Sequence, residues 1–179
     1  MFTTNEIKVL ISKDDLYQKI QDTARKINAA YSKNETLDVI CVLKGAVMFF
    51  SELIKYLEMP LRLHFVSLSS YGNERTSSGK ITIRNLEIEN LENKKVLIVE
   101  DIIDKGFTLQ FLTDYFKTNV KPKSLKTVVL LNKKQARQCN IEPDFSCFEI
   151  DDKFVVGFGL DDAEKYRNLN YIGYVILKR

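Results

Sequence analysis

One stretch of this chain decides its fold, residues 96–109, which have the sequence VLIVEDIIDKGFTL. The apolar run Val96–Val99 predicts a strand that is buried on both faces. Two carboxylates, Glu100 and Asp101, end this strand, and a short polar turn leads into a helix predicted over residues 107–117. In open parallel sheets, ligands bind beyond the carboxyl ends of the strands, so this turn is the first candidate for a functional site.

The turn offers two kinds of chemistry. Residues 105–108 supply backbone N–H groups, a hydroxyl and the positive end of a helix dipole, which are the parts of a phosphate-binding loop. Glu100 and Asp101 would repel a phosphate, and they suit sugar hydroxyls or a magnesium ion better. A polar surface loop with a chance glycine would show the same local pattern. The seven glycines form neither a G-x-G-x-x-G nor a Walker A pattern, which excludes the usual nucleotide-binding loops.

Helices and apolar strands alternate along the rest of the chain. Ser12 begins an amphipathic helix that ends near residue 34, and further helices are predicted at residues 46–57 and 107–117. Strands are predicted at residues 38–43, 61–68, 81–83, 95–99, 125–131, 145–150, 154–156 and 171–177, with a polar loop over residues 69–80. Continuous apolar strands between helices predict an α/β fold with a mostly parallel sheet covered on both faces. The length of 179 residues fits a single domain, residues 1–179.

The composition narrows the classes of function. The formal net charge is +3, from 27 basic and 24 acidic residues without a long run of like charges, so a nucleic-acid partner is not indicated. Three scattered cysteines and one histidine argue against a disulfide framework and against a zinc site. The sequence shows neither a signal peptide nor an apolar run of membrane-spanning length, so we expect a cytoplasmic protein with no membrane partner.

Residues 96–109 resemble the phosphoribosyl-pyrophosphate motif of type I phosphoribosyltransferases. That motif has an apolar strand, an acidic pair, two apolar residues and then Asp-Thr-Gly-x-Thr, where this chain has DKGFT at residues 104–108. Four further stretches resemble the hypoxanthine–guanine branch of the family in the same order: LKG at 43–45, SYG at 70–72, Lys133, and DKFVVG at 152–157 with Asp161 and Arg167 downstream. The resemblance spans roughly Leu10 to Tyr174.

The resemblance implies a fold and a reaction. The fold would be a mostly parallel twisted sheet flanked by helices, with a small hood formed by the terminal segments and a flexible lid loop. The reaction would move the 5-phosphoribosyl group from phosphoribosyl pyrophosphate to a 6-oxopurine, hypoxanthine and guanine, in purine salvage, with pyrophosphate as the second product. Such a reaction needs positioning and electrostatic stabilisation of the charge on the sugar and on pyrophosphate, rather than a covalent enzyme intermediate.

The resemblance also assigns roles around the acidic turn. Asp104 matches the general base, which takes or shields a proton near purine N7. Glu100 and Asp101 would hold the ribose hydroxyls, directly or through Mg²⁺, and Asp161 would be a second Mg²⁺ ligand. The 5′-phosphate would be bound by Lys105, Gly106, Phe107 and Thr108.

The pyrophosphate subsite and the lid come from other stretches of the resemblance. Lys44 and Gly45 would bind pyrophosphate through the exposed backbone N–H groups of a strained peptide. Arg167 would add a planar cation to the same ligand. Ser70 and Tyr71 would begin the lid, which closes over the site and excludes water.

The purine subsite would be formed by three residues. Phe154 would stack on the base, Val155 would form main-chain hydrogen bonds to its edge, and Lys133 would donate to the 6-oxo group and so select oxopurines over adenine. Taken singly, Phe154 is more typical of a core residue, and Lys133 and Arg167 are more typical of exposed surface.

One residue departs from the family's pattern, and the acceptor stays open. The family usually has Thr or Ser at the position of Lys105, so we expect activity with an altered affinity for the sugar donor. The alternatives are a xanthine-preferring enzyme, an adenine or pyrimidine phosphoribosyltransferase, and a non-catalytic nucleotide-sensing regulator that binds nucleic acid. The retained Asp104 and Lys44 count against the regulator. The family is commonly dimeric or tetrameric, so the resemblance implies a homodimer or homotetramer.

Overall fold

The structure is a computed structural model that describes residues 6–70, 81–87 and 90–176. Its strands are β1 (Glu6–Ile11), β2 (Leu37–Leu43), β3 (Leu61–Ser70), β4 (Ile81–Glu87), β5 (Lys95–Ile103), β6 (Ser124–Asn132), β7 (Phe145–Glu149), β8 (Val155–Val156) and β9 (Ile172–Ile176). Its helices are α1 (Lys13–Ala30), α2 (Val47–Leu53) and α3 (Phe107–Tyr115), with the 3-10 helices η1 (Ile54–Tyr56) and η3 (Lys134–Ala136) and the π-helix η2 (Phe116–Val120). No helix in this part of the chain is long and apolar enough to cross a membrane.

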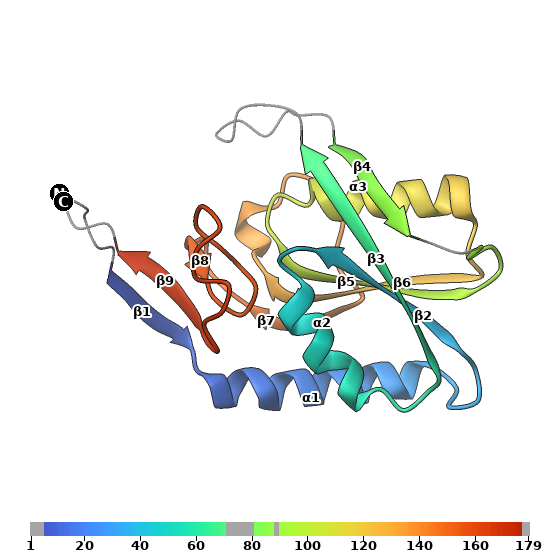
Figure 1. The fold of residues 1–179 in the computed structure, drawn as a ribbon, viewed down its shortest axis with the longest axis horizontal. Coiled ribbons are helices and arrows are strands. Elements are labelled where there is room, and N and C mark those ends of the chain that lie inside the picture. The colour runs from blue at the N-terminus through green and yellow to red at the C-terminus, as the bar shows by residue number, and fades with distance from the viewer. Residues whose placement is uncertain (1–5, 71–80, 88–89, 177–179) are drawn as a thin grey trace.

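Six strands form the main sheet, in the order β4-β3-β2-β5-β6-β7. β2 pairs in parallel with β3 and β5, β5 pairs in parallel with β6, and β6 pairs in parallel with β7. Only the edge strand β4 is antiparallel to its neighbour β3. Figure 1 shows α1 and α2 on one face of this sheet and α3 on the other. The α/β fold predicted from the sequence, with a mostly parallel sheet between helices, is confirmed.

Alternate residues of β5 face two different cores. Leu97 and Val99 belong to the cluster that includes α1 and α2, whereas Val96 and Ile98 belong to the cluster that includes α3. All four side chains have no exposed surface. Successive side chains of a strand point to opposite faces, so a strand that helices cover on both faces has a continuous apolar sequence. This is the physical reason for the run at residues 96–99.

A second, three-stranded sheet joins segments from the two ends of the chain, in the order β1-β9-β8. β1 is antiparallel to β9, and β9 is antiparallel to β8. The strands predicted at residues 154–156 and 171–177 are confirmed as β8 and β9 with slightly different ends. No strand was predicted at residues 6–11, whose ladder partner lies at the other end of the sequence.

Several predicted boundaries are wrong, among them those of β5, α2 and β3. The strand predicted at residues 95–99 continues to Ile103, because this residue still pairs with Asn132 of β6. The helix predicted over residues 46–57 ends at Leu53 and is followed by one 3-10 turn. The polar loop predicted from residue 69 starts later, because β3 extends to Ser70, which pairs with Ile81.

A buried ion cluster connects β2 with β3. Asp38 has no exposed surface, and its Oδ1 atom lies 2.8 Å from Nε2 of His64 and 2.9 Å from Nε of Arg62. Its other oxygen accepts a hydrogen bond from Nη2 of Arg62 at 3.0 Å. The parallel register places both partners, since it sets Asp38 opposite Arg62 and Ile40 opposite His64.

Replacing Asp38 with Ala should lower the free energy of unfolding by about 3 kcal/mol, because it removes the buried acceptor that Arg62 and His64 share. Urea unfolding at pH 7 measures this change. The control is Lys33→Gln, which breaks the exposed ion pair with Glu58 and should change the free energy by less than about 0.5 kcal/mol. Similar effects of the two variants would show that the buried cluster does not stabilise the sheet.

Candidate active site

The turn after β5 is shaped by a glycine. Gly106 precedes α3 with a φ angle of 93°, in the left-handed region that side chains disfavour. A Cβ atom at this position would also lie 3.0 Å from Cδ of Arg137 and 3.1 Å from Cγ2 of Ile141. The nine-residue helix α3 then starts at Phe107, and its N-terminus can offer backbone N–H groups to an anion.

A segment that follows β6 holds this turn in place. Nη1 of Arg137 donates a hydrogen bond to the carbonyl oxygen of Asp104 at 2.9 Å. The backbone N–H groups of Gln138 and Cys139 both donate to the carbonyl oxygen of Lys105, at 2.9 and 3.2 Å. The Arg137 side chain is 9% exposed. Arg137 was not predicted as a site residue, because an arginine in a polar segment is usually exposed.

The acidic pair is shielded from solvent, with Glu100 buried and Asp101 half-buried. The sequence predicted that Glu100 and Asp101 end the strand. In the structure β5 continues past them, so the pair lies within the strand. Glu100 is 8% exposed, and its Oε2 atom has no hydrogen-bond partner among the described residues. Burial raises the pKa of Glu100 well above its ordinary value, and the charge of Asp101 raises it further. Burial also raises the pKa of Asp101 to about 6, although a hydrogen bond from the N–H group of Ile102 opposes this shift.

Close backbone packing brings the predicted pyrophosphate residues to the acidic pair. The peptide bond between Leu43 and Lys44 is cis. A Cβ atom on Gly45 would lie 1.7 Å from Oδ2 of Asp101, so only glycine fits here without moving the carboxylate. A Cβ atom on Gly159 would lie 2.0 Å from the carbonyl oxygen of Gly45. The end of β2, the acidic pair of β5 and the loop after β8 therefore meet at one point.

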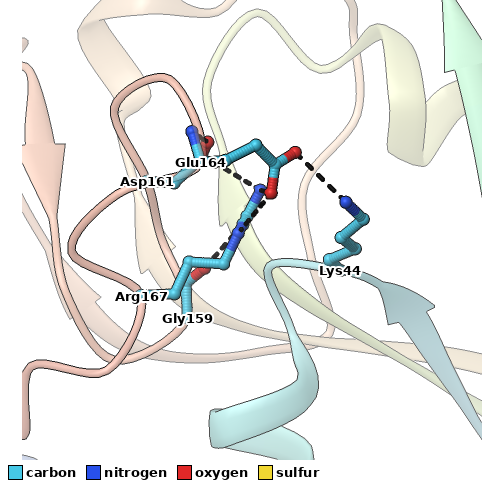
Figure 2. Close-up of polar contacts among 5 residues, drawn as sticks. All are labelled: Lys44, Gly159, Asp161, Glu164 and Arg167. Atoms are coloured by element: carbon cyan, nitrogen blue, oxygen red, sulfur yellow. Dashed lines mark hydrogen bonds and ion pairs between the residues drawn. The ribbon is translucent and has the colours of Figure 1, made fainter.

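Four charged side chains surround this point (Figure 2). Nη1 of Arg167 donates to the carbonyl oxygen of Gly159 at 2.8 Å, and its Nη2 lies 2.8 Å from Oδ1 of Asp161. Glu164 links two cations, since Oε1 accepts from Nζ of Lys44 at 3.2 Å and Oε2 accepts from Nε and Nη2 of Arg167 at 3.3 Å. The hydrogen bond from Lys44 lowers the pKa of Glu164, and the charge of Arg167 lowers it further. Lys44 and Arg167 were predicted as neighbours at one ligand, whereas Glu164 was not predicted.

Of the three predicted purine residues, Lys133 lies beside the turn after β5, and Phe154 and Val155 lie at the start of β8. The Lys133 side chain is only 7% exposed, which contradicts the alternative of a solvated lysine, and its Nζ lies 3.9 Å from Oδ2 of Asp104. The same Nζ donates to Oδ1 of Asp152 at 3.3 Å. Phe154 is 59% exposed, which contradicts the alternative of a core residue and leaves its ring free to stack on a base. Val155 is buried in the pairing of β8 with β9.

The remaining predicted residues differ in how far they can be placed. Lys105 and Thr108 are half-buried, and Phe107 is 37% exposed at the start of α3. Ser70 is the last residue of β3, and only its backbone is described. Tyr71 and the rest of the predicted lid lie outside the described residues, so the lid stays a prediction.

The acidic pair suits a magnesium ion that binds together with a phosphorylated ligand. Within residues 6–70, 81–87 and 90–176, no three His, Cys, Asp or Glu side chains form a ready metal cluster. Magnesium is commonly held by one or two carboxylates and by substrate phosphates, and the unpartnered Oε2 of buried Glu100 is a hard oxygen of this kind. Asp161 fits less well, because Arg167 and the N–H group of Glu164 already occupy its two oxygens.

A parallel sheet with an acidic pair in its central strand, followed by a glycine turn and a helix N-terminus, defines an α/β protein that can bind a ribose phosphate. The fold is that of the type I phosphoribosyltransferases. The phosphoribosyl transferase domain family matches residues 12–163, and the chain belongs to this family. The resemblance stated from the sequence is therefore confirmed.

Individual relatives agree with this assignment. The chain is 44% identical over 166 residues to a hypoxanthine-guanine phosphoribosyltransferase of Bacillus subtilis, across 93% of this chain and 91% of the relative. It superposes on the crystal structure of a hypoxanthine-guanine phosphoribosyltransferase from Bacillus anthracis with a TM-score of 0.90 and 41% identity, across 96% and 100% of the two chains. A hypoxanthine phosphoribosyltransferase from Staphylococcus aureus superposes with a TM-score of 0.88 and 37% identity, across 94% and 91% of the two chains.

Replacing Asp101 with Asn should stabilise the protein at pH 7.5 but not at pH 4. The folded-state pKa of about 6 exceeds the ordinary 3.8, so between these pH values the folded chain keeps a proton that the unfolded chain has released. This stabilisation is present below about pH 4 and is lost as the pH rises through 6. Asparagine does not ionise, so the variant keeps this stabilisation at high pH. Its amide oxygen can still accept the hydrogen bond from the N–H group of Ile102.

Urea unfolding at both pH values tests this expectation. We expect the variant to exceed the wild type by about 2 kcal/mol at pH 7.5 and to match it at pH 4. The same difference at both pH values would mean that ionisation of Asp101 is not the cause.

Proposed function

We propose that this chain transfers the 5-phosphoribosyl group from phosphoribosyl pyrophosphate to hypoxanthine, and to guanine, in purine salvage. The observation that carries the proposal is the buried ammonium of Lys133, 3.9 Å from Oδ2 of Asp104. This ammonium can donate to a 6-oxo group, but it offers no acceptor to the 6-amino group of adenine. Membership of the phosphoribosyl transferase domain family and similarity to hypoxanthine-guanine phosphoribosyltransferases support the proposal.

In this proposal the phosphate of the sugar donor binds at the start of α3. The backbone N–H groups of the helix N-terminus and the hydroxyl of Thr108 would hold the 5′-phosphate. Lys105 would add an ammonium group where the family usually has a hydroxyl, so the affinity for the donor should differ from that of relatives with threonine. The other members of this subsite are Gly106 and Phe107.

The ribose and pyrophosphate groups would lie where β2, β5 and the loop after β8 meet. Glu100 and Asp101 would accept hydrogen bonds from the ribose hydroxyls. Lys44, Gly45 and Arg167 would bind pyrophosphate and stabilise the negative charge that grows on it as the bond to ribose C1 breaks. Held in this way, the sugar presents C1 to a purine nitrogen on the side of Lys133.

Asp104 would be the general base for the purine. Its carboxylate is 47% exposed and sits within reach of the same ligand as Lys133, so it can take or shield the proton near N7 while Lys133 donates to the 6-oxo group. The exposed ring of Phe154 would stack on the base, and the main chain of Val155 would hydrogen-bond its edge. The two contacts then fall on one edge of the base, where N7 and the 6-oxo group are neighbours, which agrees with the 3.9 Å between Nζ of Lys133 and Oδ2 of Asp104.

We include Mg²⁺ in the proposal as the cofactor. It would be held by Glu100 and Asp101, with Asp161 as a further ligand after rearrangement of its ion pair with Arg167. When bound, the ion supplies positive charge to the pyrophosphate group of the donor.

The proposal extends to assembly and location. The protein would be a single domain, residues 1–179, with the small sheet as a hood. It would form a homodimer or homotetramer. It would be cytoplasmic, without nucleic-acid or membrane partners. Apolar side chains that are 36–44% exposed on α2 and β3 support self-association, since such groups commonly mark protein interfaces. They are Val47, Met48, Leu63 and Phe65.

A panel of bases tests the proposal directly. The protein is mixed with phosphoribosyl pyrophosphate, Mg²⁺ and one base at a time, and nucleotide formation is followed. We expect turnover with hypoxanthine and guanine and none with adenine or a pyrimidine. Preference for xanthine would favour the xanthine-specific alternative, and no product with any base would favour the nucleotide-sensing regulator.

Replacing Asp104 with Asn should lower kcat with hypoxanthine by about 10²-fold or more, because the amide cannot take a proton. Steady-state kinetics at saturating donor measure this change. The control is Asp114→Asn, which alters an exposed carboxylate of α3 that hydrogen-bonds only Gln110 among the described residues. Equal kcat values for the wild type and the Asp104 variant would remove Asp104 from the mechanism.

A further inference from the structure

The contacts of Glu164 bear on how the pyrophosphate subsite is filled and emptied. We propose that the Glu164 carboxylate is a built-in competitor for pyrophosphate, which bridges Lys44 and Arg167 in the free enzyme and is displaced when the donor binds. The inference rests on the proposed function, because it takes pyrophosphate to be the ligand of these two cations. Glu164 itself would not touch the reacting atoms.

The Glu164 carboxylate contacts Lys44 and Arg167 in the way that we expect of a pyrophosphate group. Each oxygen of the Glu164 carboxylate binds a different cation, Oε1 to Lys44 and Oε2 to Arg167 (Figure 2). A diphosphate group also presents several anionic oxygens that can bridge two cations. In the described part of the chain, Glu164 is the only ion-pair partner of Lys44. Lys44 therefore has to give up this contact before it can serve another anion fully.

The bridge is weak enough to be opened. The side chains of Lys44 and Glu164 are 67% and 65% exposed, and water and salt screen an ion pair that is this exposed. Pyrophosphate carries more charge than one carboxylate, so it can displace Glu164 at modest cost. A buried bridge would instead block the subsite, because opening it would leave desolvated charges without partners.

Arg167 can change partners without moving. Its Nη1 donates to the carbonyl oxygen of Gly159 and its Nη2 contacts Asp161, both at 2.8 Å. These contacts do not involve Glu164, and the Arg167 side chain is only 25% exposed. Departure of Glu164 would expose Nε of Arg167 and leave the guanidinium in place. The Glu164 bridge therefore occupies a guanidinium that other contacts already hold in position, and it is not needed to position that group.

The backbone around Glu164 keeps its carboxylate near the two cations. Asp162 and Lys165 pair through two backbone hydrogen bonds of 3.2 and 3.0 Å, and the turn between them contains only Ala163 and Glu164. Both turn residues have positive φ angles, 50° and 65°, a conformation that usually selects Asn and Gly. The N–H group of Glu164 also donates to Oδ2 of Asp161 at 2.8 Å. A short turn of this kind lets the side chain swing away while its Cα stays close.

The same arrangement favours release of the product. When pyrophosphate leaves, the tethered carboxylate can return to Lys44 and Arg167 and neutralise them. Competition from a group that is always nearby weakens the binding of free pyrophosphate, because only the fraction of molecules with an open bridge can bind it, so the difference appears mainly in the association rate. Glu164 would thus lower the affinity for the donor and, in return, reduce rebinding of the product.

Replacing Glu164 with Gln should make inorganic pyrophosphate bind about 2- to 10-fold more tightly, because the amide keeps the size of the side chain and removes the competing charge. Isothermal titration calorimetry at low ionic strength and fixed Mg²⁺ concentration measures the Kd. A rapid-mixing experiment should show that most of the gain is a faster association, because a larger fraction of the variant has an open site. Glu164→Asp, which is one methylene shorter and cannot bridge both cations as well, should give an intermediate Kd.

The matched control is Asp162→Asn, which removes one negative charge from the same turn. No ion pair of Asp162 with Lys44 or Arg167 occurs in the described ranges, so its Kd should stay within about 2-fold of the wild type. Weaker or unchanged binding by the Gln variant would overturn the inference, and so would an equal gain in the control. If base turnover is present, these outcomes count against the inference alone, whereas a wild type without turnover or pyrophosphate binding would overturn the proposed function as well.

Discussion

The parallel pairing of β5 between β2 and β6 is the constraint on which the site depends. Residues 96–99 are buried on both faces of the sheet, so a shift of one residue in register would exchange the side chains that face the two cores. The same ladder fixes Glu100 and Asp101, and Glu100 pairs with Val129 of β6. The desolvation that contributes most to the raised pKa values of buried Glu100 and half-buried Asp101 therefore follows from the length of β5.

Contacts between backbones then place the groups that come from other parts of the chain. The Oδ2 atom of Asp101 occupies the space beside Gly45, and the carbonyl oxygen of Gly45 occupies the space beside Gly159. The first contact fixes the position of Lys44, which precedes Gly45. The second fixes the position of Arg167, which donates a hydrogen bond to the carbonyl oxygen of Gly159. The backbone positions of the two cationic residues are thus determined by the packing of main chain and glycines. The exposed ion pairs affect only where their side chains point.

The sequence predicts those features whose cause is local. The apolar run at residues 96–99 predicts a strand buried on both faces, and Gly106 indicates a turn with a positive φ angle before a helix. The buried position of Lys133 could be expected only from the order of the family's motifs, because its own neighbours are polar. Glu164 and Arg137 could not be predicted, since the contacts that bring them to the site, with Lys44 and with the carbonyl oxygen of Asp104, join residues far apart in the sequence. The same reason explains why β1 was not predicted.

The pairing of β1 with β9 sets an order of events during synthesis of the protein. Glu6–Ile11 leaves the ribosome long before its partner strand, Ile172–Ile176, has been made. Contacts between such distant segments carry a large loop-closure entropy and form late. Among the described strands, β8 pairs with β9 alone, so Phe154 and Val155 also reach their final positions late. A nascent chain can thus pair β5 with β2 and form the turn before α3 well before β9 is available, so Phe154 and Val155 take their places only after the main sheet has formed.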